Sequence, residues 1–349
     1  MVKNSLNLFL ILSTLYLVSC SSGLEGIEIN DPKKYQVTRD IKWASPEGFD
    51  LTLDIYQPSL EKQSFPVLII FHGGGWLVNN KSIMDQMSQY LATNSQYVIC
   101  NVNYRLLSDL DNSVTLNEIV EDAFGSVLWI KENIAKYKGD PKRVAVTGDS
   151  AGAHLAAMIV NSPESVTLNN NFEENLGFVP TYLPEGKTAE DIINKNLMSV
   201  QAAILSYGAF DVYEGAKSGL ESSKNPFWYF SGSLPRKVFG NQYDHINNPE
   251  MYKTLSPIYN IPDASIRALP PQLLTVGSED KLTTPESIKI YQEELKSKNQ
   301  ISEYWIHDNR NHAFLDSGTN IFLGSKFEED APEALDKMIS FLDTVFAVN

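Results

Sequence analysis

Residues 144–160 read VAVTGDSAGAHLAAMIV, and this segment carries the strongest indication of the fold. It joins a short apolar run to a run of small and apolar residues, which we expect to form a buried strand and a helix packed closely on a sheet. Between them, Gly148-Asp149-Ser150-Ala151-Gly152 matches the G-x-S-x-G pattern. In that pattern a serine on a tight strand-to-helix turn exposes its hydroxyl, and glycines leave room for the strained backbone. The stretch predicts an α/β fold with Ser150 as a nucleophile.

A glycine-rich loop lies upstream, where residues 72–76 read HGGGW directly after the apolar run 67–71. Backbone without side chains is therefore expected at the carboxyl end of a strand, where amides can point toward a developing oxyanion. We expect the amides of Gly73, Gly74 and Ala151 to be the donors. A phosphate-binding loop is the alternative, but no Gly-Lys-Ser/Thr follows and no G-x-G-x-x-G opens a helix.

Strand and helix patterns alternate along most of the chain, as in a sheet with helices on both faces. Alternating polarity over 49–56 predicts a strand that pairs with 35–43 as an antiparallel hairpin. The further expected strands are 67–71, 97–102, 144–148, 202–207, 272–276 and 304–306. The expected helices are 83–92, 116–137, 151–160, one that opens at 283–286, and 328–346.

Two long stretches, 162–197 and 214–263, interrupt this alternation. Loops of this length in a compact domain usually carry a function or local structure, so we expect insertions above the sheet, the second forming a cap. The aromatic run 227–230 in the second stretch either stacks on a substrate ring or forms a small core of its own.

The HGGGW and GDSAG motifs together resemble the hormone-sensitive-lipase-like branch of the α/β-hydrolases, which includes bacterial carboxylesterases and feruloyl-esterase-like enzymes. The resemblance extends from Phe49 to the carboxyl terminus. It implies a mostly parallel central sheet flanked by helices on both faces, with a cap insertion. It also implies that the acid is Asp280, after the strand at 272–276, and that the general base is His312, after the last strand.

Other residues compete for these roles. Glu279 is the alternative acid, and His307 is the alternative base. The remaining candidates are expected to be framework or surface groups: His72, Asp149, Asp308 and Asp316, with Asp308 and Asp316 as solvated loop carboxylates.

These roles define an ester hydrolysis mechanism. His312 removes the proton from Ser150, Asp280 orients the imidazole, and an acyl-enzyme is then hydrolysed by water. We expect short-chain acyl or aryl esters as substrates, including acetyl or feruloyl esters of polysaccharides. The alternatives are a serine peptidase of the same fold and a non-catalytic binding protein on a hydrolase scaffold. We expect no cofactor and no metal, because the five histidines are not spaced as a zinc site.

The charge balance restricts the partners. The chain has 349 residues, with 43 acidic against 28 basic side chains and a formal net charge of −15. Such a field repels polyanions, so nucleic acid is excluded as a partner and a small or glycan-linked ester fits better. Of the two cysteines, Cys100 lies in an apolar run and is expected to be a buried, inert thiol.

The amino terminus has the pattern of a targeting segment. Lys3 precedes an apolar run over residues 6–18 that is too short for a membrane span. Residues 17–20, LVSC, resemble the lipobox of bacterial lipoproteins, which implies lipidation of Cys20. An ordinary secretory signal is the alternative. We therefore expect a signal peptide at 1–19, a tether at 20–34 and a hydrolase domain at 35–349, exported and anchored at the periplasmic or cell-surface face of a membrane.

Overall fold

The computed structural model describes residues 34–61 and 64–348. An eight-stranded sheet runs through it in the order β1-β2-β4-β3-β5-β6-β7-β8. The strands are β1 Tyr35–Ala44, β2 Leu51–Pro58, β3 Phe65–Phe71, β4 Val98–Val102, β5 Gly139–Asp149, β6 Ala202–Ser206, β7 Gln272–Gly277 and β8 Ser302–His307. β1 and β2 pair antiparallel, as does β2 with β4, and the other neighbours pair in parallel. The predicted mostly parallel sheet and its opening hairpin are confirmed.

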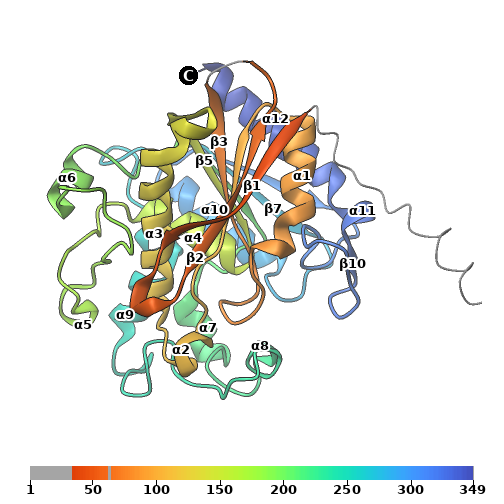
Figure 1. Cartoon of the computed structure of the whole chain (residues 1–349). Helices are drawn as coiled ribbons and strands as arrows, with labels where there is room; N and C mark the ends of the chain where they lie inside the picture. Colours follow the sequence, from red (N-terminus) through yellow and green to blue (C-terminus); the bar gives the residue numbers. More distant parts are fainter. Residues whose placement is uncertain (1–33, 62–63, 349) are drawn as a thin grey trace, which may run out of the picture.

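Helices cover both faces of this sheet (Figure 1). α3 and α4 pack together on one face, and α1 and α12 pack together on the other. The longer helices are α1 Asp85–Asn94, α3 Leu116–Asn133, α4 Ala151–Asn161, α10 Pro285–Ser297 and α12 Pro332–Val348. This double cover explains why the strand β3, with sequence FPVLIIF, is buried along its whole length.

Strand register brings the carboxyl ends of the parallel strands to one edge. Phe71 of β3 pairs with Val102 of β4 and with Gly148 of β5, and Asp149 pairs with Ser206 of β6. Loops that leave these strands therefore start side by side, although they are far apart in the sequence. This edge is where polar residues at strand ends can meet.

Two predicted helices have different boundaries. The segment 116–137 is α3 followed by a 3-10 turn, Ile134–Tyr137. The segment 328–346 is two helices, α11 Phe327–Asp330 and α12, because Pro332 has no amide to continue the first helix and instead occupies the first turn of the second. The predicted start of α10 is confirmed, with Thr284 as its N-cap and Pro285 in its first turn.

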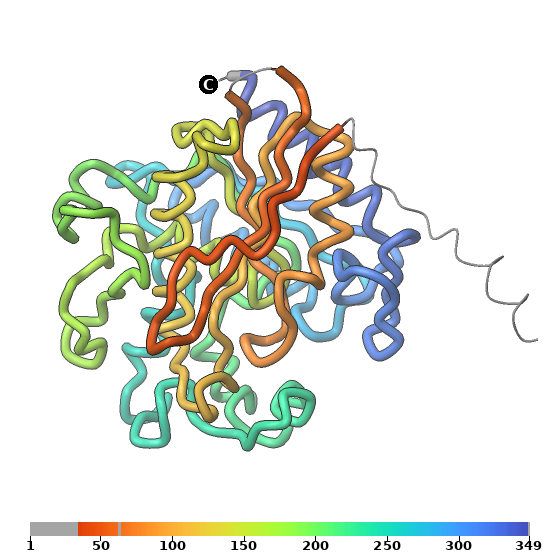
Figure 2. Tube along the Cα trace, in the orientation of Figure 1, coloured from red at the N-terminus to blue at the C-terminus, as the bar shows by residue number. Residues whose placement is uncertain are grey.

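The two stretches outside the alternation contain short helices joined by irregular backbone (Figure 2). Segment 162–197 holds α5 Phe172–Asn175 and α6 Ala189–Asn194. Segment 214–263 includes most of α7 Val212–Ser218 and all of α8 Pro226–Phe230 and α9 Pro249–Thr254, with a 3-10 turn at Pro257–Asn260. In Figure 1, α7, α8 and α9 gather with α2 Asp109–Asn112 at one end of the sheet.

Three smaller elements complete the fold. A two-stranded hairpin, β9 Thr319–Asn320 and β10 Ser325–Lys326, was not expected from the sequence. Two 3-10 turns lie at Pro46–Gly48 and Lys81–Met84.

The described chain begins at the edge of the sheet opposite the carboxyl ends of the parallel strands. Tyr35 pairs with Pro58 at the end of β2, whereas Leu53, near the start of β2, pairs with Val102 at the end of β4. Within the described residues, no helix is both long and apolar enough to cross a bilayer. The predicted signal peptide, Cys20 and residues 20–33 of the predicted tether lie outside the described residues.

Candidate active site

Ser150 stands at the turn between β5 and α4, with φ 51° and ψ −115°. Few residues other than glycine adopt this conformation, so the turn stores strain. Close packing holds it in place. A Cβ on Gly152 would lie 2.0 Å from the carbonyl oxygen of Phe71, and one on Gly148 would lie 2.3 Å from the Gly152 carbonyl carbon. Both glycines of the motif are therefore required because backbone approaches backbone there.

Three predicted residues meet at this turn. The Nδ1 atom of His312 lies 2.7 Å from Oδ2 of Asp280, and Nε2 lies 3.0 Å from Oγ of Ser150. An ionised carboxylate only accepts hydrogen bonds, so Nδ1 carries the proton and donates to Asp280. In the neutral ring Nε2 is then the acceptor, and the Ser150 hydroxyl donates to it. The serine is thus connected to a base that is itself oriented by a carboxylate.

Backbone and side-chain contacts hold Asp280 in position. Oδ1 of Asp280 accepts from the amides of Leu282 and Thr283, at 2.8 and 3.0 Å. The Thr283 hydroxyl donates to the carbonyl of Tyr207 at 2.7 Å, which ties this loop to the end of β6. The Tyr207 ring packs edge-on against His312, with centroids 4.7 Å apart. The carboxylate and the imidazole therefore have little freedom to turn.

The competing candidates are not part of this arrangement. Glu279 is exposed, and its amide donates to the carbonyl of Arg310. His307 is the last residue of β8 and is buried, and its Nε2 donates to the carbonyl of Asp330 at 2.8 Å. The structure brings Ser150 and His312 together with Asp280, and it leaves both alternatives outside.

His72 has the framework role expected for it. Its Nδ1 donates to the carbonyl of Gly73 at 2.7 Å, and its ring stacks on Tyr104 with centroids 4.3 Å apart. The Tyr104 hydroxyl donates to the His72 carbonyl at 2.5 Å. Burial lowers the pKa of His72 to about 4, so the ring is neutral and supports the glycine loop without a charge.

The first glycine of the loop contacts the residue before the nucleophile. The amide of Gly73 donates to the carboxyl of Asp149, and a Cβ on Gly73 would lie 2.3 Å from Oδ2 of that carboxyl. Gly73 is therefore packed against Asp149, and it is not among the residues that line the pocket. Gly74, with φ 121°, lines the pocket itself. Ala151 is the first residue of α4, where an amide has no partner within the helix.

A pocket of about 230 Å³ opens above Ser150 and His312. Gly74 and Asn79 line one side of it. Asp149 of β5 also lines it. The rest of its wall comes from α8 and from the segment 313–323: Phe227, Phe230, Ala313, Asp316, Asn320, Phe322 and Leu323. The rings of Phe230 and Phe322 pack edge-to-face across the rim, with centroids 5.2 Å apart. The pocket thus has an apolar rim above a polar floor.

The prediction that Asp316 is a solvated loop carboxylate is wrong. Its side chain is buried and lines the pocket, whereas Asp308 is exposed as expected. Asp316 closes the sequence His312-Ala-Phe-Leu-Asp, and the intervening residues are fully or almost fully buried. An acid at the end of a buried apolar run was the available signal, and the prediction overlooked it.

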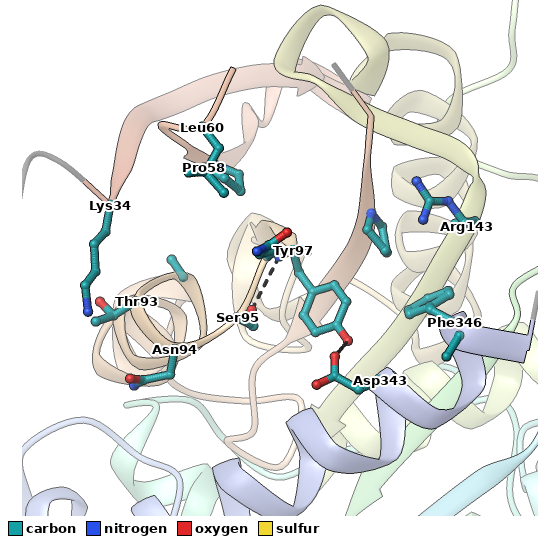
Figure 3. Close-up of a pocket in the computed structure, with 14 residues that line it drawn as sticks. Lys34, Pro58, Leu60, Thr93, Asn94, Ser95, Tyr97, Arg143, Asp343 and Phe346 are labelled. Carbon is teal, nitrogen blue, oxygen red and sulfur yellow. Dashed lines mark hydrogen bonds between the residues drawn. The ribbon is translucent and has the colours of Figure 1, made fainter. Parts of the chain in front are cut away.

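A larger hollow of about 740 Å³ lies at the opposite edge of the sheet (Figure 3). Its wall includes Pro58 and Tyr97, and the Tyr97 hydroxyl donates to Asp343 of α12. Ser95 also lines it, but no described histidine does. Without a base beside the serine, this hollow does not offer the chemistry of the Ser150 pocket.

Comparisons with known proteins identify related sequences and a shared fold. The BD-FAE family model matches residues 53–295. Carboxylesterase NlhH of Mycobacterium tuberculosis is 30% identical over 117 residues, which are 34% of this chain and 35% of the relative. Esterase LipQ of the same species is 27% identical over 79% of this chain and 57% of its own length. The matched regions thus span between about a third and three fifths of these relatives.

Solved structures show the same fold. The apo form of Thermogutta terrifontis esterase 2 superposes with a TM-score of 0.60 at 20% identity, covering 90% of this chain and 95% of that one. Its propionate-bound form gives a TM-score of 0.59 at 21% identity. The α/β-hydrolase fold predicted from the two motifs is confirmed. Because the family model covers most of the chain, including the glycine loop, the serine turn and Asp280, this protein belongs to the BD-FAE family.

Proposed function

We propose that the protein is a serine carboxylesterase in which Ser150 attacks the ester carbonyl and His312 takes its proton. The observation that carries this proposal is the continuous hydrogen-bonded series from Ser150 through His312 to Asp280, at 3.0 and 2.7 Å. Asp280 fixes the tautomer and stabilises the imidazolium that forms. The same imidazolium then protonates the leaving alcohol, and His312 next activates water to release the acid.

The developing oxyanion needs donors that are already in place. We assign this role to the amides of Gly74 and Ala151, since one belongs to a pocket residue and the other to the free amino end of α4. Gly73 supports them indirectly, because its amide fastens the loop to Asp149. This assignment changes the role of Gly73 from a direct donor to a support.

The pocket volume and rim favour small esters. A volume of about 230 Å³ accommodates a short acyl chain or a single ring, and the apolar rim around Phe230 and Phe322 suits an aryl or acyl group. We propose short-chain acyl or aryl esters as substrates, with acetyl and feruloyl esters of polysaccharides as candidates for natural ones.

The test is hydrolysis of 4-nitrophenyl acetate and butyrate by the purified protein beside Ser150→Ala, at neutral to mildly alkaline pH. We expect the variant to lose about 10⁵- to 10⁶-fold in kcat, since removal of a nucleophile costs that much in serine hydrolases. A fluorophosphonate should label the wild type at Ser150, as mapped by mass spectrometry of the peptides. A folded wild type that neither turns over nor is labelled would contradict the proposal, and cleavage of peptides alone would indicate a peptidase.

We further propose that a lipid on Cys20 anchors the enzyme at the periplasmic or cell-surface face of a membrane. The placement of Tyr35 supports this, because the described chain begins at the sheet edge opposite the pocket, so an anchor on that side leaves the pocket open to substrate. Membrane fractionation tests it. Cys20→Ala should move the protein to the soluble fraction, and an unchanged distribution would contradict the anchor.

A further inference from the structure

Two carboxyl groups lie beside the proposed catalytic residues and have no part in the mechanism described so far. Asp149 and Asp316 both line the pocket with Ser150 and His312, and their exposed fractions are only 2% and 7%. They come from different parts of the fold, one from the end of β5 and the other from the loop that follows His312. Burying two carboxyl groups in the wall of one pocket lowers the stability of the fold. Their position beside the proposed catalytic residues therefore calls for a role toward the ligand.

Asp149 is the inner member of this pair. Its carboxyl accepts from the Gly73 amide, while Oδ1 is buried without a hydrogen-bond partner in the described structure. Burial raises the pKa of Asp149 well above its usual range, and the negative charge of Asp316 raises it further. Two carboxyls so placed do not both ionise readily, because each negative charge disfavours the other.

Asp316 is the outer member and carries the charge. Burial raises its pKa to about 6, and the neighbouring His312 opposes that rise, as does a hydrogen bond with the side chain of Asn320. It is therefore mostly ionised at neutral pH. No lysine or arginine is among the described residues that line the pocket, so of these residues only His312 can offset this charge, when its ring is protonated.

We propose that Asp316, together with Asp149 in the same pocket wall, determines the charge selectivity of the pocket. Esters that carry an anionic group near the scissile bond are rejected. Neutral esters and those with a cationic group or a hydrogen-bond donor would be accepted. This inference rests on the proposed esterase function and adds a substrate class to it. The physical reason is that a buried charge is poorly screened by water, so a second negative charge brought close to it is strongly disfavoured.

The experiment uses three acetates of the same shape and different charge: 3-acetoxybenzoate, 3-acetoxybenzamide and 3-acetoxy-N,N,N-trimethylanilinium. kcat/KM is measured for the full-length protein at pH 7.5 and divided by the rate of hydroxide hydrolysis of each ester, which removes intrinsic reactivity. We expect the wild type to prefer the neutral amide over the anionic benzoate by at least tenfold. In Asp316→Asn this ratio should fall to within about threefold.

Asp308→Asn is the matched control, because it removes the same charge from an exposed position four residues before His312. Its selectivity ratio should equal that of the wild type. Equal ratios in all three proteins, or the same change in both variants, would overturn the inference. Turnover of none of the acetates by the wild type would instead overturn the proposed function, and this inference with it.

Thermal unfolding shows whether Asp316→Asn is folded. If the variant is not folded, the test uses the wild type alone, and the inhibition constants of 3-hydroxybenzoate and 3-hydroxybenzamide as competitive inhibitors are compared. Weaker inhibition by the anion, by at least tenfold, supports the inference. Equal inhibition contradicts it.

Discussion

The turn that carries Ser150 and the helix α8 that overhangs it are built in opposite ways. At the turn, Gly148 and Gly152 touch neighbouring backbone so closely that no side chain fits. In α8, consecutive aromatics have different surroundings: Trp228 is 1% exposed and donates to the carbonyl of Leu220, whereas Tyr229 is 84% exposed. The turn permits one geometry, while Tyr229 on the exposed side of α8 has little packing to constrain it.

The turn that carries the nucleophile and the rim that receives the substrate have different structural requirements. A nucleophile needs a position accurate to a fraction of an ångström, which backbone-to-backbone packing supplies. A rim that receives different esters needs only a suitable surface, which a few exposed side chains supply. Changes at the turn should therefore abolish turnover or the fold, and changes in the outer segments should be tolerated.

Asp280→Asn should have the largest of the effects that follow. The amide side chain no longer fixes the imidazole with its proton on Nδ1, so we expect kcat to fall by about 10³- to 10⁴-fold while the protein stays folded. Glu279→Gln, one residue earlier and exposed, should retain wild-type turnover. Comparable losses in both variants would show that the loop, and not the carboxylate at 280, matters.

Gly152→Ala should cost more than about 3 kcal/mol of stability, because its Cβ would lie 2.0 Å from the Phe71 carbonyl oxygen and backbone must shift. Gly215→Ala in α7 is the same change in an outer segment, where the new Cβ meets Leu220 at an ordinary 3.8 Å. We expect this second variant to be neutral or stabilised by up to about 1 kcal/mol. Denaturant unfolding measures both, and similar costs would remove the contrast between the two regions.

Glu121→Gln tests how segment 162–197 docks on α3. Glu121 accepts from the Val179 amide at 3.2 Å, and burial raises its pKa to about 8 from an ordinary 4.5. At pH values between 4.5 and about 8, the carboxyl is ionised in the unfolded chain but protonated in the folded protein. The free energy of unfolding therefore falls as pH rises through this range. We expect wild-type stability to fall by on the order of 2 kcal/mol more than that of the variant between pH 5 and 9.

The control for this measurement is Glu185→Gln, at an exposed position of the same segment. Its unfolding free energy should follow the wild-type pH dependence. Parallel curves for the wild type and Glu121→Gln would mean that the carboxyl of Glu121 is not desolvated by the docked segment.

Phe230→Ala should have the smallest effect. Half of this side chain is exposed, so the unfolding free energy should stay within about 0.5 kcal/mol of the wild type. Loss of its contact with Phe322 should lower kcat/KM by up to about tenfold for aryl or butyryl esters and less for acetate. Tyr229→Ala, an exposed aromatic that does not line the pocket, should change neither quantity. Equal effects of the two variants would exclude a specific role for the rim.

The sequence determined the parts of this protein that depend on short-range geometry. We could predict the glycines around Ser150, the loop at 72–76 and the strand ends before Asp280 and His312. A tight turn or a strand end requires particular residue types at neighbouring positions, so its pattern is visible in a short segment. The parallel sheet followed from its continuous apolar strands. Two helix boundaries were misjudged, at Ile134 and at Pro332, although the physical signal at Pro332 was present in the sequence.

The residues that cover the pocket and those on its floor could not be predicted from the sequence, because they are brought together by folding. The hairpin β9–β10 brings Phe322 to Phe230, ninety-two residues earlier in the chain, and no local pattern encodes that pairing. Asp316 was expected in solvent, yet packing buries it beside Asp149. The burial of Asp316 and the pairing of the two rings depend on contacts between segments that are distant in the sequence. They are therefore seen only in the folded structure.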